Sequence, residues 1–139
     1  MDKDIALQAR LVGWYALILV VIAIALMAIA MLTGISSGSG GTVAGIFAAA
    51  VPGDIFYRRT GTLPSNAFSW RMAGLFTLAN LVISVVPLLA FGTEGPALAT
   101  PAFWILALFI YAIVFVGLRF AFSWGASSRQ KAVDQKAQG

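Results

Sequence analysis

Four apolar stretches, separated by short polar segments, set the predicted elements of the chain. Residues 11–33 carry no charged side chain, and two further long apolar stretches cover residues 65–91 and 101–124. Each is long enough to cross the hydrocarbon core of a bilayer as a helix, which takes about 20 mostly apolar residues. Residues 43–60 are shorter, rich in Ala and Gly, and only weakly hydrophobic. The pattern predicts an all-α membrane protein with three or four spans.

The positions of the basic residues decide between three and four transmembrane spans. Short loops rich in Lys and Arg stay on the cytoplasmic side of a membrane. Residues 34–42 carry no charge and residues 92–100 carry only Glu94, so the basic residues all lie elsewhere: Lys3, Arg10, Arg58, Arg59, Arg71, Arg119, Arg129, Lys131 and Lys136. Four crossings place all of them on one side, whereas three crossings would divide them. We therefore expect one domain (residues 1–139), an antiparallel bundle of four transmembrane helices with short loops, cytoplasmic termini and a polar cytoplasmic tail at 127–139.

The residues that flank the four stretches are typical of helix ends. Glycine easily adopts the left-handed conformation that ends a helix, and the candidates for this role are Gly34, Gly61 and Gly92. Ser65 is a candidate N-cap of the third stretch, and Thr100 followed by Pro101 reads as the N-cap and first residue of the fourth. The first stretch exceeds the 7–15 apolar residues of a secretory signal, so we expect it to be retained.

Aromatic residues mark the predicted membrane surfaces. Trp and Tyr are enriched at the level of the lipid headgroups. The candidates on the cytoplasmic side are Trp14, Tyr15, Tyr57, Trp70 and Trp124, and Trp104 is the candidate on the other side. Trp104 and Trp124 are 20 residues apart, which in a helix is about 30 Å, or one hydrocarbon thickness.

Composition removes several kinds of chemistry. The chain is 60% hydrophobic and 10% charged, and it contains neither Cys nor His. Disulfides, thiolate chemistry and imidazole ligation of a metal are therefore excluded. Asp54 and Glu94 are predicted on opposite sides of the membrane, too far apart to act as an acid–base pair. We expect a non-enzymatic protein without a cofactor or metal. The net charge of +4 favours anionic lipids, with Arg58, Arg59 and Arg71 as headgroup contacts, over nucleic acid, because no aromatic–basic platform accompanies it.

The second stretch carries a small residue at every fourth position: Ser37, Gly41, Gly45, Ala49 and Gly53. Such a face lets another helix approach closely. It predicts either packing against the other three spans, which we favour because so weakly hydrophobic a helix is best buried, or a seam with a second copy or a partner subunit. Pro52 predicts a kink in this helix, and Pro87 one in the third.

The third stretch carries Thr77, Asn80 and Ser84 on one helical face. Asn80 is predicted near the middle of the membrane. Polar residues there either line a polar pathway or hydrogen-bond between helices, and the second role is the commoner one.

Asp54 and Arg119 are predicted at similar depth, just below the cytoplasmic surface. Ionisable residues within a span are candidates for function, with a partner to be identified. One hypothesis is an Asp54–Arg119 ion pair that joins the second and fourth spans. In the alternative, Asp54 pairs with Arg58 at i, i+4 and Arg119 extends to the headgroups.

A group of residues between the second and third stretches resembles a known family. Residues 37–85 resemble a family of uncharacterised, four-span bacterial inner-membrane proteins of about 140 residues. The shared features are the small-residue second span and the residues Phe56, Arg58, Gly61, Pro64, Trp70 and Arg71. This resemblance implies a fold and a bacterial cytoplasmic membrane, but no activity.

A second similarity is to ATP synthase protein I, a four-span helper of rotor-ring assembly. The residues in comparable order are Ser39, Gly40, Gly41, Pro52, Phe56 and Arg59. That family also has an acidic residue and a Lys in its third span, whereas this chain has no charge between Arg71 and Glu94.

These observations favour an accessory or assembly subunit of a larger membrane complex, with a bioenergetic complex as one candidate host. Its expected partners are membrane lipids and other integral membrane subunits, and a homo-oligomer is an open alternative. The competing hypothesis is a small transporter or channel that self-associates through Gly45, Ala49 and Gly53, with the polar face of the third span along its pathway.

Overall fold

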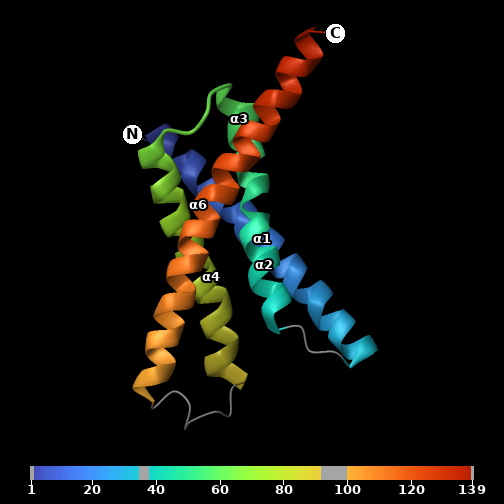
Figure 1. The fold of residues 1–139 in the computed structure, drawn as a ribbon, viewed down its shortest axis with the longest axis vertical. Coiled ribbons are helices and arrows are strands. Elements are labelled where there is room, and N and C mark those ends of the chain that lie inside the picture. Colours follow the sequence, from blue (N-terminus) through green and yellow to red (C-terminus); the bar gives the residue numbers. More distant parts are fainter. Residues whose placement is uncertain (1, 35–37, 92–99, 139) are drawn as a thin grey trace.

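The computed structural model describes the backbone of residues 2–34, 38–91 and 100–138, and the side chains of residues 4–34, 42–83 and 100–138. The described residues form helices and short connections, without a strand, so the all-α fold class is confirmed. In the numbering of Figure 1 the helices are α1 (Asp2–Thr33), α2 (Gly38–Ala48), α3 (Ala50–Thr60), α4 (Asn66–Phe91) and α6 (Pro101–Gln138).

The helices form two hairpins that cross at one end of the molecule and spread apart at the other (Figure 1). Helix α1 packs against α2 and α3 in the first hairpin, and α4 packs against α6 in the second. Contacts between α3 and α6, and between α1 and α4, hold the hairpins together. Both chain termini and the connection from α3 to α4 lie at the crossed end, which we call the basic end. The end where the hairpins spread apart is called the open end.

The residues that were expected to end helices do so where they are described. Gly34 and Gly61 adopt φ values of 69° and 66°, and their N–H groups donate to Ala30 and Tyr57 carbonyls at 2.9 Å in each case. The Ser65 hydroxyl accepts a hydrogen bond from the Phe68 N–H at 3.2 Å, as an N-cap does. Helix α6 begins at Pro101, as expected. Gly92 lies outside the described residues.

The second stretch is a bent helix rather than a straight one. Pro52 has no N–H, and its ring crowds the carbonyl of Ala48, which is the last residue of α2. At the bend the Ala49 N–H donates to the Ile46 carbonyl at 3.1 Å, a tighter i−3 bond, and the Gly53 N–H reaches the Ala49 carbonyl at 3.4 Å. Helices α2 and α3 are therefore one bent element, and the kink expected at Pro52 is present.

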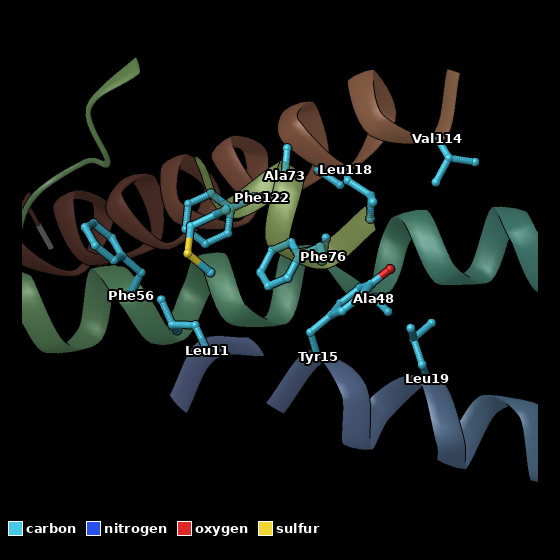
Figure 2. Close-up of a cluster of buried hydrophobic side chains, with 13 residues drawn as sticks. Leu11, Tyr15, Leu19, Ala48, Phe56, Ala73, Phe76, Val114, Leu118 and Phe122 are labelled. Carbon is cyan, nitrogen blue, oxygen red and sulfur yellow. The ribbon is translucent and has the colours of Figure 1, made fainter. Parts of the chain in front are cut away.

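The buried core occupies only the half of the molecule nearest the basic end. Figure 2 shows side chains from every helix converging there. The core residues are Leu11, Tyr15, Leu19, Ala48, Ala49, Phe56, Met72, Ala73, Phe76, Val114, Leu118, Ala121 and Phe122. On the long helices α1 and α6 these positions are confined to 11–19 and 114–122, and Ile22 of α1 and Ile83 of α4 are partly buried against the core on the side of the open end.

Among the described residues, two helices are long and apolar enough to cross a bilayer by length and composition, over Asp4–Thr33 and Pro101–Gln138. Only 6% and 22% of their most apolar windows are buried inside the protein. The core helix of a soluble protein would be mostly buried. These two helices are apolar, but the rest of the chain does not cover most of their surface.

Helix α6 does not end at Trp124. It continues to Gln138 through the polar residues expected to form a tail. Over its 38 residues it is about 57 Å long, almost twice a hydrocarbon thickness. The tail at 127–139 is therefore largely a helical extension of the last apolar stretch.

Candidate functional site

The closest approach between the hairpins is the crossing of α3 and α6 at Gly53 and Gly125. A Cβ placed on Gly53 would lie 3.0 Å from the Ala126 nitrogen and still closer to the Phe122 carbonyl oxygen. A Cβ on Gly125 would lie 2.8 Å from the Ala50 Cα and would overlap the Ala50 carbonyl oxygen. The two backbones are thus in direct contact, which only residues without a side chain allow.

The rest of the small-residue face packs against α1. The Tyr15 hydroxyl donates to the Gly45 carbonyl at 3.3 Å, and a Cβ on Gly45 would meet the Leu19 side chain at 3.3 Å. Ala49 is fully buried. The face therefore divides, with Gly45 toward α1 and Gly53 toward α6. This is the packing within one chain that the sequence favoured over a seam between chains; Gly41 lies outside the residues whose side chains are described.

The bend explains why Tyr15 is buried. In a regular helix the Gly45 carbonyl would accept the Ala49 N–H, but that N–H is turned to Ile46. The Gly45 carbonyl therefore lacks its usual helical donor, and the Tyr15 hydroxyl donates a hydrogen bond to it instead. Tyr15 is completely buried, and its ring stacks on Phe76 at 4.4 Å between centroids. The expectation that Tyr15 belongs to an interfacial belt is therefore wrong.

Asp54 pairs with two arginines, neither of which is Arg119. One carboxylate oxygen lies 2.7 Å from the Arg58 Nε, and the other lies 3.5 Å from the Arg129 Nε. The first contact is the i, i+4 pair foreseen as the alternative. The second joins α3 to the extension of α6. The Asp54–Arg119 pair is not formed.

The geometry of α6 explains this correction. Asp54 follows Gly53, which faces Gly125. Arg129 is four residues beyond Gly125 and lies about 40° around the helix from it, whereas Arg119 is six residues before Gly125 and lies about 120° around the helix from it. Equal depth in a membrane, which was the basis for the predicted pair, does not specify which side of the helix a residue occupies.

Arg119 instead faces α4. Its Nη2 donates to the Asn66 Oδ1 at 2.6 Å, and its guanidinium lies 4.5 Å from the centroid of the Trp70 ring. Asn66 and Trp70 are one turn apart and share a face of α4. The same interface contains a hydrogen bond from the Ser123 hydroxyl to the Ser69 hydroxyl at 3.3 Å. Arg119 therefore stabilises the second hairpin through its contacts with α4.

The remaining predicted surface residues are exposed. This holds for the basic side chains Arg58, Arg59 and Arg71, and for the aromatic side chains Trp14, Trp104 and Trp124. Trp70 is partly exposed, and one of its faces is occupied by Arg119. Their positions along the helices place Trp104 toward the open end and the others toward the basic end.

A cavity of about 330 Å³ lies between the hairpins. Its lining is provided by Leu19, Ile22, Ala23 and Leu26 of α1, Thr42 of α2, Asn80 and Ile83 of α4, and Ile110, Tyr111 and Val114 of α6. Of the predicted polar face of α4, Asn80 lines this cavity, while the Thr77 hydroxyl donates to its own helix at the Ala73 carbonyl, 2.8 Å away. The side chain of Ser84 lies outside the described residues.

Sequence reasoning did not identify the aromatic cluster in the core. Phe122 contacts the rings of Phe76, Phe56 and Phe68 at centroid distances of 5.8, 6.0 and 6.2 Å. These residues come from three helices. The available signal was that Phe56, Phe68 and Phe122 lie close to the basic ends of their stretches, at positions where Trp or Tyr would be expected if they faced lipid headgroups.

The described residues contain no group of three or more acidic, His or Cys side chains that could hold a metal ion. Comparison of the chain with protein-family models, with curated proteins and with solved structures finds no match.

Proposed function

We propose that the chain is a four-span integral membrane protein, with both termini in the cytoplasm, that acts as an accessory or assembly subunit of a larger membrane complex. Two features support the membrane placement. The long helices α1 and α6 are apolar but largely unburied. The described basic side chains lie on segments at or near the basic end, as the positive-inside rule requires for cytoplasmic termini. The resemblance to bacterial inner-membrane proteins makes the bacterial cytoplasmic membrane the proposed location.

The uneven packing of the two hairpins is the observation that carries the accessory role. Among the residues whose side chains are described, the fully buried core is confined to the half near the basic end, and many apolar side chains of α1 and α6 toward the open end are exposed. Leu108, for example, is 75% exposed. Association of helices within a bilayer depends on close packing between them. The open half therefore offers unused packing surface that the helices of a partner subunit would cover.

The competing transporter hypothesis combined self-association through Gly45, Ala49 and Gly53 with a polar face on α4 and the helix-breaking prolines. Gly45 and Gly53 make contacts within the chain, which favours the accessory subunit over that alternative. The described half near the basic end is filled by packed aromatic and aliphatic side chains. We therefore retain the accessory subunit as the better supported proposal.

The membrane placement can be tested with single cysteines, because the natural chain has none. Ala102→Cys lies at the open end and Ala137→Cys on the extension of α6, and both positions are exposed. We expect a membrane-impermeant maleimide to label Ala102→Cys in intact cells, and Ala137→Cys only in inverted vesicles. Labelling of both variants from the same side would contradict four spans.

The accessory role can be tested by photocrosslinking from two exposed positions of one helix. Leu108 lies toward the open end and is 75% exposed, whereas Phe120 lies toward the basic end and is 60% exposed. With a photoreactive phenylalanine at each position in native membranes, we expect protein crosslinks from position 108 and mainly lipid adducts from position 120. Mild-detergent purification and mass spectrometry would identify the crosslinked subunit. Crosslinks from position 108 only to lipid, or only to a second copy, would overturn the proposal.

A further inference from the structure

The cavity between the hairpins differs from the remaining open surface because it combines an apolar wall with polar groups. Helix α1 contributes only aliphatic side chains to it. The polar groups come from the other helices, as Thr42 of α2, Asn80 of α4 and Tyr111 of α6. Ligand sites in proteins are typically apolar pockets with a small number of polar groups that fix the ligand's orientation. The cavity has this composition.

Its size sets the scale of the occupant. A volume of about 330 Å³ is near the lower end of the usual range of roughly 300–1,000 Å³ for small-molecule sites. It equals the liquid volume of about eleven water molecules. The cavity can thus hold one ring-sized group or a short length of chain, but not a whole helix of a partner. It is a site of a different kind from the partner surface proposed above.

The charge of the lining restricts the chemistry of the occupant further. None of the ten described lining residues is ionisable near neutral pH. The charged pair partners Asp54, Arg58 and Arg129, together with Arg119, are on segments nearer the basic end. In the proposed bilayer placement, a charged headgroup among these described residues would be separated from water without a counter-charge, which is strongly unfavourable. The occupant is therefore neutral.

The polar groups define what the occupant carries. The hydroxyl groups of Thr42 and Tyr111 can each donate and accept, and the Asn80 amide has two donors and an acceptor, so it can serve a ligand in addition to any protein contact. Saturated acyl chains offer nothing to these groups. A carbonyl or hydroxyl oxygen on an otherwise apolar molecule would match them.

We propose that this cavity binds a neutral lipophile with a carbonyl or hydroxyl group, whose oxygen meets Asn80 and Tyr111 and whose apolar part lies against α1. The class includes neutral glycerolipids and quinones. This inference rests on the proposed membrane placement but not on the proposed partner. The cysteine-labelling test above is independent of any ligand, so failure of the membrane placement can be distinguished from failure of the cavity site.

The test uses the full chain in lipid nanodiscs and photoreactive, clickable lipid probes. A diacylglycerol probe presents a neutral hydroxyl head, and a fatty-acid probe of the same chain length presents a carboxylate. We expect saturable labelling of α1, α4 or α6 by the diacylglycerol, and at least fivefold weaker labelling by the fatty acid. Decylubiquinone is added as a competitor: strong displacement identifies a quinone-like ligand, and its absence identifies a glycerolipid. Equal labelling by both probes would overturn the requirement for a neutral head.

Two nearly isosteric variants test the role of the polar groups. Tyr111→Phe and Asn80→Leu remove hydrogen-bonding groups while keeping the cavity filled to a similar extent. Loss of a hydrogen bond should weaken labelling by about threefold to tenfold in each variant. Thr77→Val is the matched control on α4, because the Thr77 hydroxyl bonds to its own helix and does not line the cavity. If the diacylglycerol labels all variants equally while their melting curves are normal, the cavity holds hydrocarbon without recognising an oxygen, and the proposal is wrong.

Discussion

Substitution of alanine at Gly53 or Gly125 is the sharpest test of how the two hairpins are joined. At Gly125 the added Cβ would lie 2.8 Å from the Ala50 Cα, and closer to the Ala50 carbonyl oxygen, whereas ordinary contacts of a Cβ begin at about 3.4 Å. The opposing atoms belong to the backbone at both glycines and cannot rotate away. Helices α3 and α6 must therefore separate, and we take the separation to be on the order of 1 Å.

The magnitude follows from the contacts that such a separation weakens. A gap of 0.5–1 Å forfeits about a quarter to a half of each contact energy of roughly 0.1–0.2 kcal/mol. If about 60 atomic contacts are taken to be affected, this amounts to about 1.5–6 kcal/mol. Alanine regains about 1 kcal/mol because it favours a helix more than glycine does. The net destabilisation should be about 0.5–5 kcal/mol, a range that includes the roughly 1–3 kcal/mol usual for overpacked cores.

Gly13 provides the matched control, because it lies within α1 and a Cβ there would have no atom within 4 Å. Gly13→Ala makes the same chemical change without the overlap, so its melting temperature should equal or exceed that of the natural chain. The assay is thermal unfolding in mild detergent, followed by circular dichroism and size-exclusion chromatography. If Gly53→Ala and Gly125→Ala melt at or above the Gly13→Ala variant, the close crossing of α3 and α6 does not exist in the molecule.

Two further predictions concern single polar contacts in the half near the basic end. Tyr15→Phe should lower stability by about 1 kcal/mol, since the Gly45 carbonyl at the bend loses its donor, and unchanged unfolding in detergent would contradict that role. A double-mutant cycle of Asp54→Asn with Arg129→Gln should give a small coupling, below about 1 kcal/mol, because the carboxylate is partly exposed. The same cycle with Arg119→Gln should give none, and coupling to Arg119 instead would restore the pair expected from the sequence.

The sequence predicts the positions of the helices well because the signals are local. An apolar run, a glycine in the left-handed region at Gly34 or Gly61 and a hydroxyl cap at Ser65 depend only on neighbouring residues. The bend at Pro52 is local for the same reason: a missing N–H and a crowded carbonyl follow from the proline itself. Each of these features is therefore specified by a few consecutive residues and needs no contact between helices.

Contacts between helices were harder to predict because depth along the chain does not define the direction a residue faces. Asp54 contacts Arg129, which is ten residues or about 15 Å beyond Arg119 along α6, and Arg119 is directed toward Asn66 and Trp70 of α4. Gly125 belongs to a repeat of small residues at every fourth position, Gly117, Ala121 and Gly125, that was not used to predict the packing, and its contact with Ala50 shows its importance. Tyr15 was misplaced because a tyrosine near a membrane surface and a tyrosine that satisfies a bent helix have the same sequence environment.

Substitutions should have different effects in the two halves of the molecule. This difference allows the binding proposals for the open half to be tested separately from the stability of the half near the basic end. Near the basic end the stability of the hairpins depends on close complementarity, with Gly53 against the backbone of Phe122 and Ala126, Gly125 against Ala50, and Phe122 among three aromatic rings. Small changes of volume there should affect folding before they affect any partner. Toward the open end exposed residues such as Leu108 have few intramolecular contacts to lose. Substitutions in that half should leave the melting temperature almost unchanged, so a loss of partner or lipid binding caused by them can be assigned to the surface itself. A binding surface on helices that are fixed at one end and open at the other can also adapt its width to an occupant without disturbing the core.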